Sequence, residues 1–198
     1  MPEASWGDEP EPELTAPRSR RRLALVLAAS ALLGLAVLTV AWRITDRGVP
    51  DRQVALPVSV LGLPRDPAAP DQAVKLALAH VPNDLIDPHA GVYGSYPDAL
   101  LVIAARAHAW RPGSQVEGFR SGFVRSGAHL DAGRDVPTGE LGGEARCWAA
   151  TLAGERPTVC VFADRGSLLA TVDFLGGGVD DAARRGLRVR EATVHARS

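Results

Sequence analysis

Residues 144–175 read EARCWAATLAGERPTVCVFADRGSLLATVDFL. Three β-rich runs of strand length occupy residues 144–151, 157–163 and 168–175, and the turn residues Gly154-Glu155 and Asp164-Arg165-Gly166 separate them. Runs of this kind, bounded by Gly and Asp, are typical of strands joined by tight turns. The stretch therefore predicts a three-stranded antiparallel meander.

Both cysteines of the chain lie in the first hairpin of this meander. A turn centred near Gly154-Glu155 places Cys147 opposite Cys160, and opposed residues of a non-hydrogen-bonded antiparallel pair have Cα atoms about 4.5 Å apart. That separation lies at the short end of the range that a disulfide spans. A reactive thiol is the alternative, but the sequence has no Cys-x-x-Cys, and Arg146 is the one basic neighbour. We therefore predict a structural disulfide between Cys147 and Cys160.

The segments Leu141-Gly142-Gly143-Glu144-Ala145-Arg146-Cys147 and Cys160-Val161-Phe162-Ala163-Asp164 carry a resemblance. With the run that follows them, they resemble the C-terminal half of a group of actinobacterial single-pass membrane proteins of unknown function. The likeness covers residues 137–175 in motif detail, and Phe162 stands where that group usually has Trp. It implies an extracytoplasmic domain with a disulfide, and it implies no activity.

Helical patterns lie on both sides of the meander. Residues 71–80 and 180–195 have apolar side chains at helical spacing, with Asp residues at their amino ends. Ser114 and Glu117 have the spacing of a capping box, and Val116, Phe119 and Phe123 share one helical face after it. Each of these three segments is therefore predicted to be a helix.

The run Ala99–Ala105 fits a buried strand or a helix, and its Leu-Leu-Val-Ile centre favours a strand. Residues 83–97 and 128–137 are rich in turn residues and predict loops. Together these patterns predict an α+β domain over residues 71–198. In this domain, helices pack on one face of a small, mostly antiparallel sheet.

Residues 23–42 (LALVLAASALLGLAVLTVAW) contain no charged side chain. About 20 apolar residues are the length that an α-helix needs to cross a bilayer. A cluster of arginines precedes this segment, which predicts a cytoplasmic N-terminus and a C-terminal domain outside the cytoplasm: Arg18, Arg20, Arg21 and Arg22. We expect one N-terminal transmembrane helix, with the lipid bilayer as a partner.

Two other interpretations of this segment are less well supported. A cleavable signal has a shorter apolar region and a small-x-small cleavage site, whereas this run ends in Ala41-Trp42-Arg43. Ser19-Arg20-Arg21-Arg22-Leu23 resembles a twin-arginine signal, but a plain positive-inside cluster is the better explanation. An uncleaved signal anchor is therefore the prediction.

The flanks of this helix differ in composition. Residues 1–22 have almost nothing apolar to bury and predict a disordered cytoplasmic tail. Residues 43–70 are rich in Pro and predict a semi-rigid extracytoplasmic spacer. The apolar stretch Val54–Leu63 leaves open whether part of this spacer docks on the domain.

No pattern in the sequence indicates catalysis. The chain has 22 basic and 23 acidic side chains, a balance that gives no footprint for nucleic acid. Its five histidines do not fall at metal-ligand spacing. The Ser121 segment is out of register with a nucleophile elbow, and Gly176–Gly178 and Asp164 are interpreted as turn residues. We therefore predict no catalytic, cofactor or metal site and no enzyme activity.

Two function hypotheses remain. The first is a membrane-anchored extracytoplasmic module of the cell envelope that binds an unidentified envelope protein or ligand, or has a structural role, without catalysis. The second is an extracytoplasmic hydrolase with an unrecognised active site. A concave cluster of titratable side chains would favour the hydrolase, and an exposed apolar patch would favour the binding module.

Overall fold

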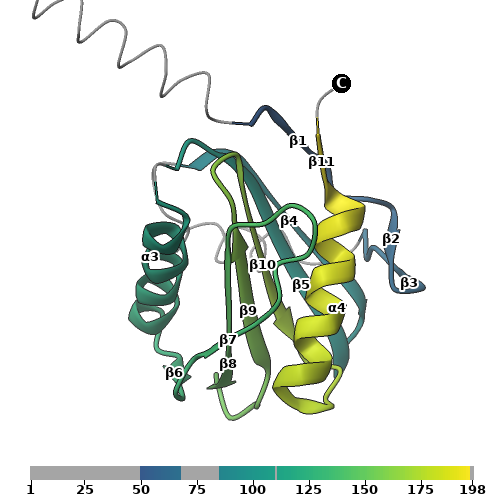
Figure 1. Ribbon diagram of the computed structural model, residues 1–198. Helices are drawn as coiled ribbons and strands as arrows, with labels where there is room; N and C mark the ends of the chain where they lie inside the picture. The colour runs from purple at the N-terminus through teal and green to yellow at the C-terminus, as the bar shows by residue number, and fades with distance from the viewer. Residues whose placement is uncertain (1–49, 68–84, 110, 197–198) are drawn as a thin grey trace, which may run out of the picture. The chain divides into compact units, whose positions relative to one another are not determined.

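A seven-stranded sheet forms the centre of the computed structural model, which describes residues 50–67, 85–109 and 111–196 (Figure 1). Its order is β4-β5-β10-β9-β8-β6, and β7 also pairs with β8. All these pairs are antiparallel. The strands are β4 (Leu85–Ser95), β5 (Asp98–Ala107), β6 (His129–Leu130), β7 (Arg134–Asp135), β8 (Glu144–Thr151), β9 (Thr158–Ala163) and β10 (Ser167–Asp173).

The predicted meander is confirmed as β8, β9 and β10. The turn between β8 and β9 has Ala153 and Gly154 at its centre, with φ of 52° and 89°. Positive φ at both central residues is the mark of the two-residue turns that fit the twist of a hairpin. This turn sets the register in which Cys147 faces Cys160.

β4 corrects the loop that residues 83–97 predict. Residues 85–95 form an edge strand that pairs with β5. The pairing of β4 with β5 shifts its register between Ile86 and His89, and Pro88 lies within this shift. Proline is tolerated in edge strands and at such irregularities. For this reason a strand here contains residues that are typical of a loop. The apolar run of residues 99–105 lies in β5, so the preference for a strand there is confirmed.

The two helices cover opposite faces of the sheet, which corrects the expectation that helices pack on one face. α3 (Pro112–Arg125) packs on the face that contains Trp148 and Val161, and α4 (Gly178–Thr193) packs on the face that contains Cys160 and Phe162. Figure 1 shows the sheet between them. All six residues of β9 are buried, as expected for a strand that is covered on both sides. A mostly antiparallel sheet with two described helices confirms the α+β class.

The amino end of α3 differs from the predicted capping box. Arg111 is the N-cap residue and makes no side-chain capping bond. Ser114 lies inside the helix, where its Oγ donates to the carbonyl of Arg111 at 2.7 Å. The helix begins at Pro112, whose fixed φ suits a first turn. The predicted apolar face is present, because Val116 and Phe119 are buried against the sheet.

α4 is followed by a strand where the sequence predicts more helix. The helix ends at Thr193, and β11 (Val194–Ala196) takes the last residues of the predicted helix 180–195. β11 pairs antiparallel with β1 (Arg52–Val54), and Figure 1 shows these two strands side by side. The chain before β4 therefore contributes to the same folded unit as α4.

Residues 50–67, the described part of the expected spacer, pack on this unit. A hairpin of β2 (Ser59–Val60) and β3 (Leu63–Pro64) follows β1. Val60 is buried in the core, and the hydroxyl of Tyr93 donates to the carbonyl of Pro57 at 2.9 Å. The stretch whose docking the sequence left open is thus docked.

Several expectations lie outside the described residues: the tail 1–22, the span 23–42, the helix over 71–80 and the boundary at residue 70. Within the described ranges, no helix is long and apolar enough to cross a membrane.

Candidate functional site

A cavity of about 470 Å³ lies between α3 and the β7–β8 edge of the sheet. Its volume is in the range of about 300–1,000 Å³ that is usual for ligand pockets. Its lining comes from the first half of α3, from β7 and the residues after it, and from β8: Gly113, Val116, Glu117, Asp135, Val136, Thr138, Gly143, Glu144, Ala145 and Arg146.

Arg146 is the basic residue of this cavity, and carboxylates surround it. Its Nε donates to Asp135 Oδ1 at 2.7 Å, and its Nη1 donates to Glu117 Oε1 at 3.2 Å. The β7–β8 register places Asp135 directly opposite Arg146. The hydrogen bond with Asp135 raises the pKa of Arg146, and Glu117 and Glu144 act in the same direction. Arg146 therefore stays charged and is already paired.

Glu144 lies against the first turn of α3. A Cβ at Gly113 would overlap its carboxylate, so a larger residue at this position would make the Glu144 side chain shift. The first turn of α3 has no acidic residue of its own, and a carboxylate beside a helix amino end is favourable. The lining thus has three carboxylates and one guanidinium. This excess of negative charge favours cationic and hydrogen-bond-donating groups over anions.

Asp164 forms a second polar cluster, at the turn between β9 and β10. Its Oδ1 accepts hydrogen bonds from the backbone amides of Gly166 at 2.6 Å and Ser167 at 2.8 Å. These bonds confirm that it is a turn residue. The side chain is also buried, and two arginines far away in the sequence pair with its Oδ2: Arg190 at 3.0 Å and Arg52 at 3.4 Å.

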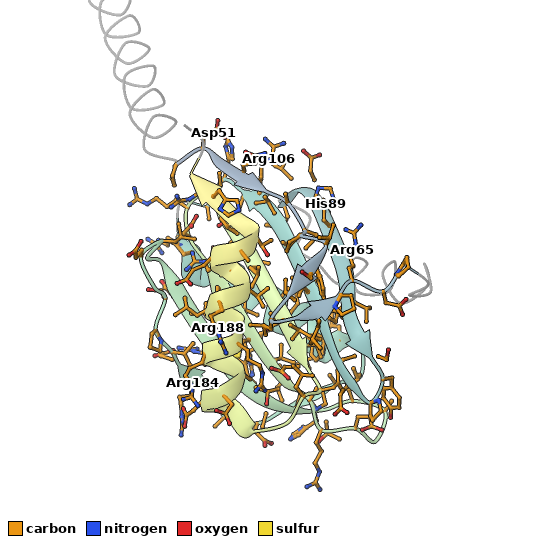
Figure 2. The ribbon with its side chains drawn as sticks, turned by 90° about the vertical axis from the view of Figure 1, so that its right-hand side faces the viewer. Asp51, Arg65, His89, Arg106, Arg184 and Arg188 are labelled. Carbon is orange, nitrogen blue, oxygen red and sulfur yellow. A yellow bond between two sulfur atoms is a disulfide. The ribbon has the colours of Figure 1, made fainter. Side chains whose placement is uncertain are left out.

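Arg190 is fully buried, which is rare for an arginine. Figure 2 shows Arg184 and Arg188 of the same helix on its outer side, whereas Arg190 points inward and lies over the ring of Phe162. Burial lowers the pKa of Arg190, and Asp164 opposes that change. Hydrogen bonds from Nη1 and Nη2 and the ion pair with Asp164 compensate for most of the lost water, whereas the buried Nε has no hydrogen-bond partner among the described residues.

The two clusters share the loop formed by residues 138–143. Nη1 of Arg190 donates to the carbonyls of Thr138 at 2.8 Å and Gly142 at 3.0 Å. Gly143 lies so close to the carbonyl of Ala163 that a Cβ there would overlap it. Thr138 and Gly143 also line the cavity. The buried ion pair therefore positions one wall of the cavity.

The predicted disulfide is present. Cys147 and Cys160 are bonded, with Cα atoms 4.1 Å apart. Both are fully buried on the face of the sheet that α4 covers. Their place under a helix indicates a structural bond, because reagents in solution cannot reach it.

The other residues that the sequence singled out do not gather at either cluster. The described histidines are all exposed, and they lie on three separate strands and in the segment just after β5: His89, His129, His195 and His108. Ser121 lies inside α3. Gly177 is the N-cap residue of α4 with a φ of 84°, so the triple glycine is a turn, as interpreted. Sequence reasoning missed the cavity and both partners of Asp164, because no local pattern connects these residues.

Comparison with known proteins gives no match: no protein family, no curated protein and no solved structure is significantly similar to this chain.

Proposed function

We propose that the chain is a membrane-anchored module of the cell envelope. Residues 1–22 lie in the cytoplasm, residues 23–42 span the bilayer, and the folded unit lies outside, where it binds an envelope protein or ligand without catalysing a reaction. The Cys147–Cys160 disulfide carries the proposal. Disulfides form and persist in oxidising compartments outside the cytoplasm, and the arginines before residue 23 favour the same orientation.

The cavity between α3 and the β7–β8 edge supports a binding role. Its polar side chains are three carboxylates, one guanidinium and one hydroxyl. Glu117 and Asp135 both accept hydrogen bonds from Arg146. Carboxylates held in this way are suited to recognising hydrogen-bond donors, so the cavity is the part of the surface that we assign to the ligand.

Reporter fusions test the orientation. A phosphatase that is active only outside the cytoplasm, fused after Ser198, should be active. A cytoplasmic reporter at the same site should be silent. Replacing the arginines at positions 18, 20, 21 and 22 with neutral residues should weaken this preference, because flanking charge sets it. A silent phosphatase together with an active cytoplasmic reporter would overturn the proposal.

The anchor and the disulfide are tested on the native protein. Mass spectrometry of the membrane fraction should find chains that begin before Leu23, and recovery only of chains that begin after Trp42 would show a removable signal instead. Thiol labelling under denaturing conditions, without reductant, should leave Cys147 and Cys160 unmodified. Labelling of both cysteines would show that the disulfide is absent, and the extracytoplasmic location of the folded unit would lose its main support.

A further inference from the structure

β1 covers the buried carboxylate of Asp164. Arg52, on this strand, pairs with Asp164 Oδ2. The carbonyl of Pro50 and the side chain of Arg52 also pack so closely on Gly166 that a Cβ there would overlap both. β1 is held in place by pairing with β11 over three residues. Water therefore reaches the Asp164 turn from this side only if β1 moves away.

Arg190 connects the covered turn with the cavity. Nη2 of Arg190 donates to Asp164, and Nη1 donates to the carbonyls of Thr138 and Gly142. Such bonds are strong where water is excluded and weaken where water competes for the same groups. Loss of β1 would hydrate the Asp164–Arg190 pair and release the 138–143 loop, which forms one wall of the cavity.

We propose that β1 is a conformational latch that controls the cavity. While β1 pairs with β11, the 138–143 loop is fixed and the cavity keeps its wall; when β1 is displaced, the wall becomes mobile. The inference deepens the proposed function, since it takes the cavity as the binding site. β1 has only three residues, and none of them is fully buried, so few contacts must break for it to be displaced.

Gln53 offers a substitution that acts on the pairing alone, because its side chain is exposed. Hydrogen-bonded pairs recur at every second residue of an antiparallel ladder. Ala55 N donates to Thr193 O at 3.0 Å, so Gln53 and its opposite residue His195 also form a hydrogen-bonded pair. Gln53→Pro removes the backbone N–H of residue 53, which is the donor in this pair. Gln53→Ala retains that N–H and is the matched control.

Hydrogen exchange of the full chain in lipid nanodiscs, followed by mass spectrometry, measures the coupling. In Gln53→Pro, residues 194–196 and 138–145 should both exchange faster, on the order of tenfold. In the second segment, the amide of Gly142, bonded to Gly139 O, reports on the loop. Strand β5 should keep its rates, and Gln53→Ala should match the unmodified chain. Faster exchange at 194–196 with unchanged exchange at 138–145 would overturn the proposal.

A second measurement needs no variant. It tests the latch if Gln53→Pro fails to fold, or if this variant leaves the hydrogen exchange of residues 194–196 unchanged. Native-state exchange of the unmodified chain in increasing urea should show residues 138–145 opening together with residues 194–196, with the same urea dependence. Independent opening of the two segments would overturn the latch. The reporter fusions test the location of the folded unit separately, so failure of the latch and failure of the proposed function are distinguishable.

Discussion

The Cys147–Cys160 disulfide should contribute a large part of the stability of the folded unit. The bond closes a loop with a sequence separation of 13 residues. In the chain-entropy model, a loop of this size stabilises the fold by about 3 kcal/mol, because the cross-link restricts the unfolded chain. Whole domains are stable by about 5–15 kcal/mol. Reduction should therefore remove between about a fifth and three fifths of the total.

Urea unfolding of residues 50–198, followed by circular dichroism, measures this effect when the oxidised protein is compared with protein that has been reduced in denaturant and refolded in reductant. With a urea dependence of about 1.5–3 kcal/mol/M, a loss of about 3 kcal/mol lowers the midpoint by about 1–2 M. The dependence itself should rise on reduction, because the released chain exposes more surface when it unfolds.

The double variant Cys147→Ala/Cys160→Ala is the control for the reductant and should unfold identically with and without it. The entropic reasoning would be refuted if reduction of the unmodified sequence moved the midpoint by less than about 0.3 M, since that shift corresponds to less than about 1 kcal/mol.

Three further changes test other parts of the structure. Asp164→Asn should cost about 3–5 kcal/mol in urea unfolding, because two guanidinium groups lose their charge partner; Asp131→Asn, at an exposed site, should cost almost nothing. Gly143→Ala should lower the melting temperature far more than Gly142→Ala, because both have positive φ but only the first would overlap backbone atoms. Burial raises the pKa of Tyr93 above its ordinary 10.0. The folded chain thus holds this proton more tightly than the unfolded chain does, and the resulting stability is lost as the pH rises through the folded pKa. Tyr93→Phe should therefore flatten the loss of stability measured above about pH 10.

The meander and its register could be predicted because local chemistry determines them. A glycine at the tip and apolar strands on both sides fix which residues face each other, and Cys147 opposite Cys160 follows. The opposite placement of the two helices also had a signal. In TVCVFA of β9, apolar residues run on with little alternation, which indicates burial on both faces. This run therefore predicts helices on both faces of the sheet, in contrast to the expectation of helices on one face.

The errors at β4 and α3 have a different origin. In β4, Pro88 and the neighbouring register shift look like loop residues in the sequence, and pairing with β5 overrides that tendency. In α3, Ser114 and Glu117 have the spacing of a capping box, but Pro112 two residues earlier already starts the helix. In β4, pairing with a neighbouring strand outweighs the local preference for a loop. In α3, the proline at the first helical position outweighs the capping-box spacing.

The candidate site could not be predicted from the sequence at all. Asp164 was recognised as a turn residue, and its bonds to the amides of Gly166 and Ser167 are local. Its charge partners Arg190 and Arg52 come from a helix and a strand that are more than 120 residues apart in the sequence. Only the pairing of β1 with β11 and the packing of α4 bring them together, and neither is visible as a pattern along the chain.

The position of β10 has a consequence for how the chain folds. β10 inserts between β5 and β9 in the sheet, although one helix and three strands separate β5 from β9 along the chain. The ribosome makes β5 long before β10. During synthesis, the edge of the apolar strand β5 that later pairs with β10 therefore has no partner. An unpaired apolar edge can join a neighbouring chain instead of its own. The completion of the sheet must therefore wait for the C-terminal third of the chain, and conditions that slow synthesis there should favour aggregation over folding.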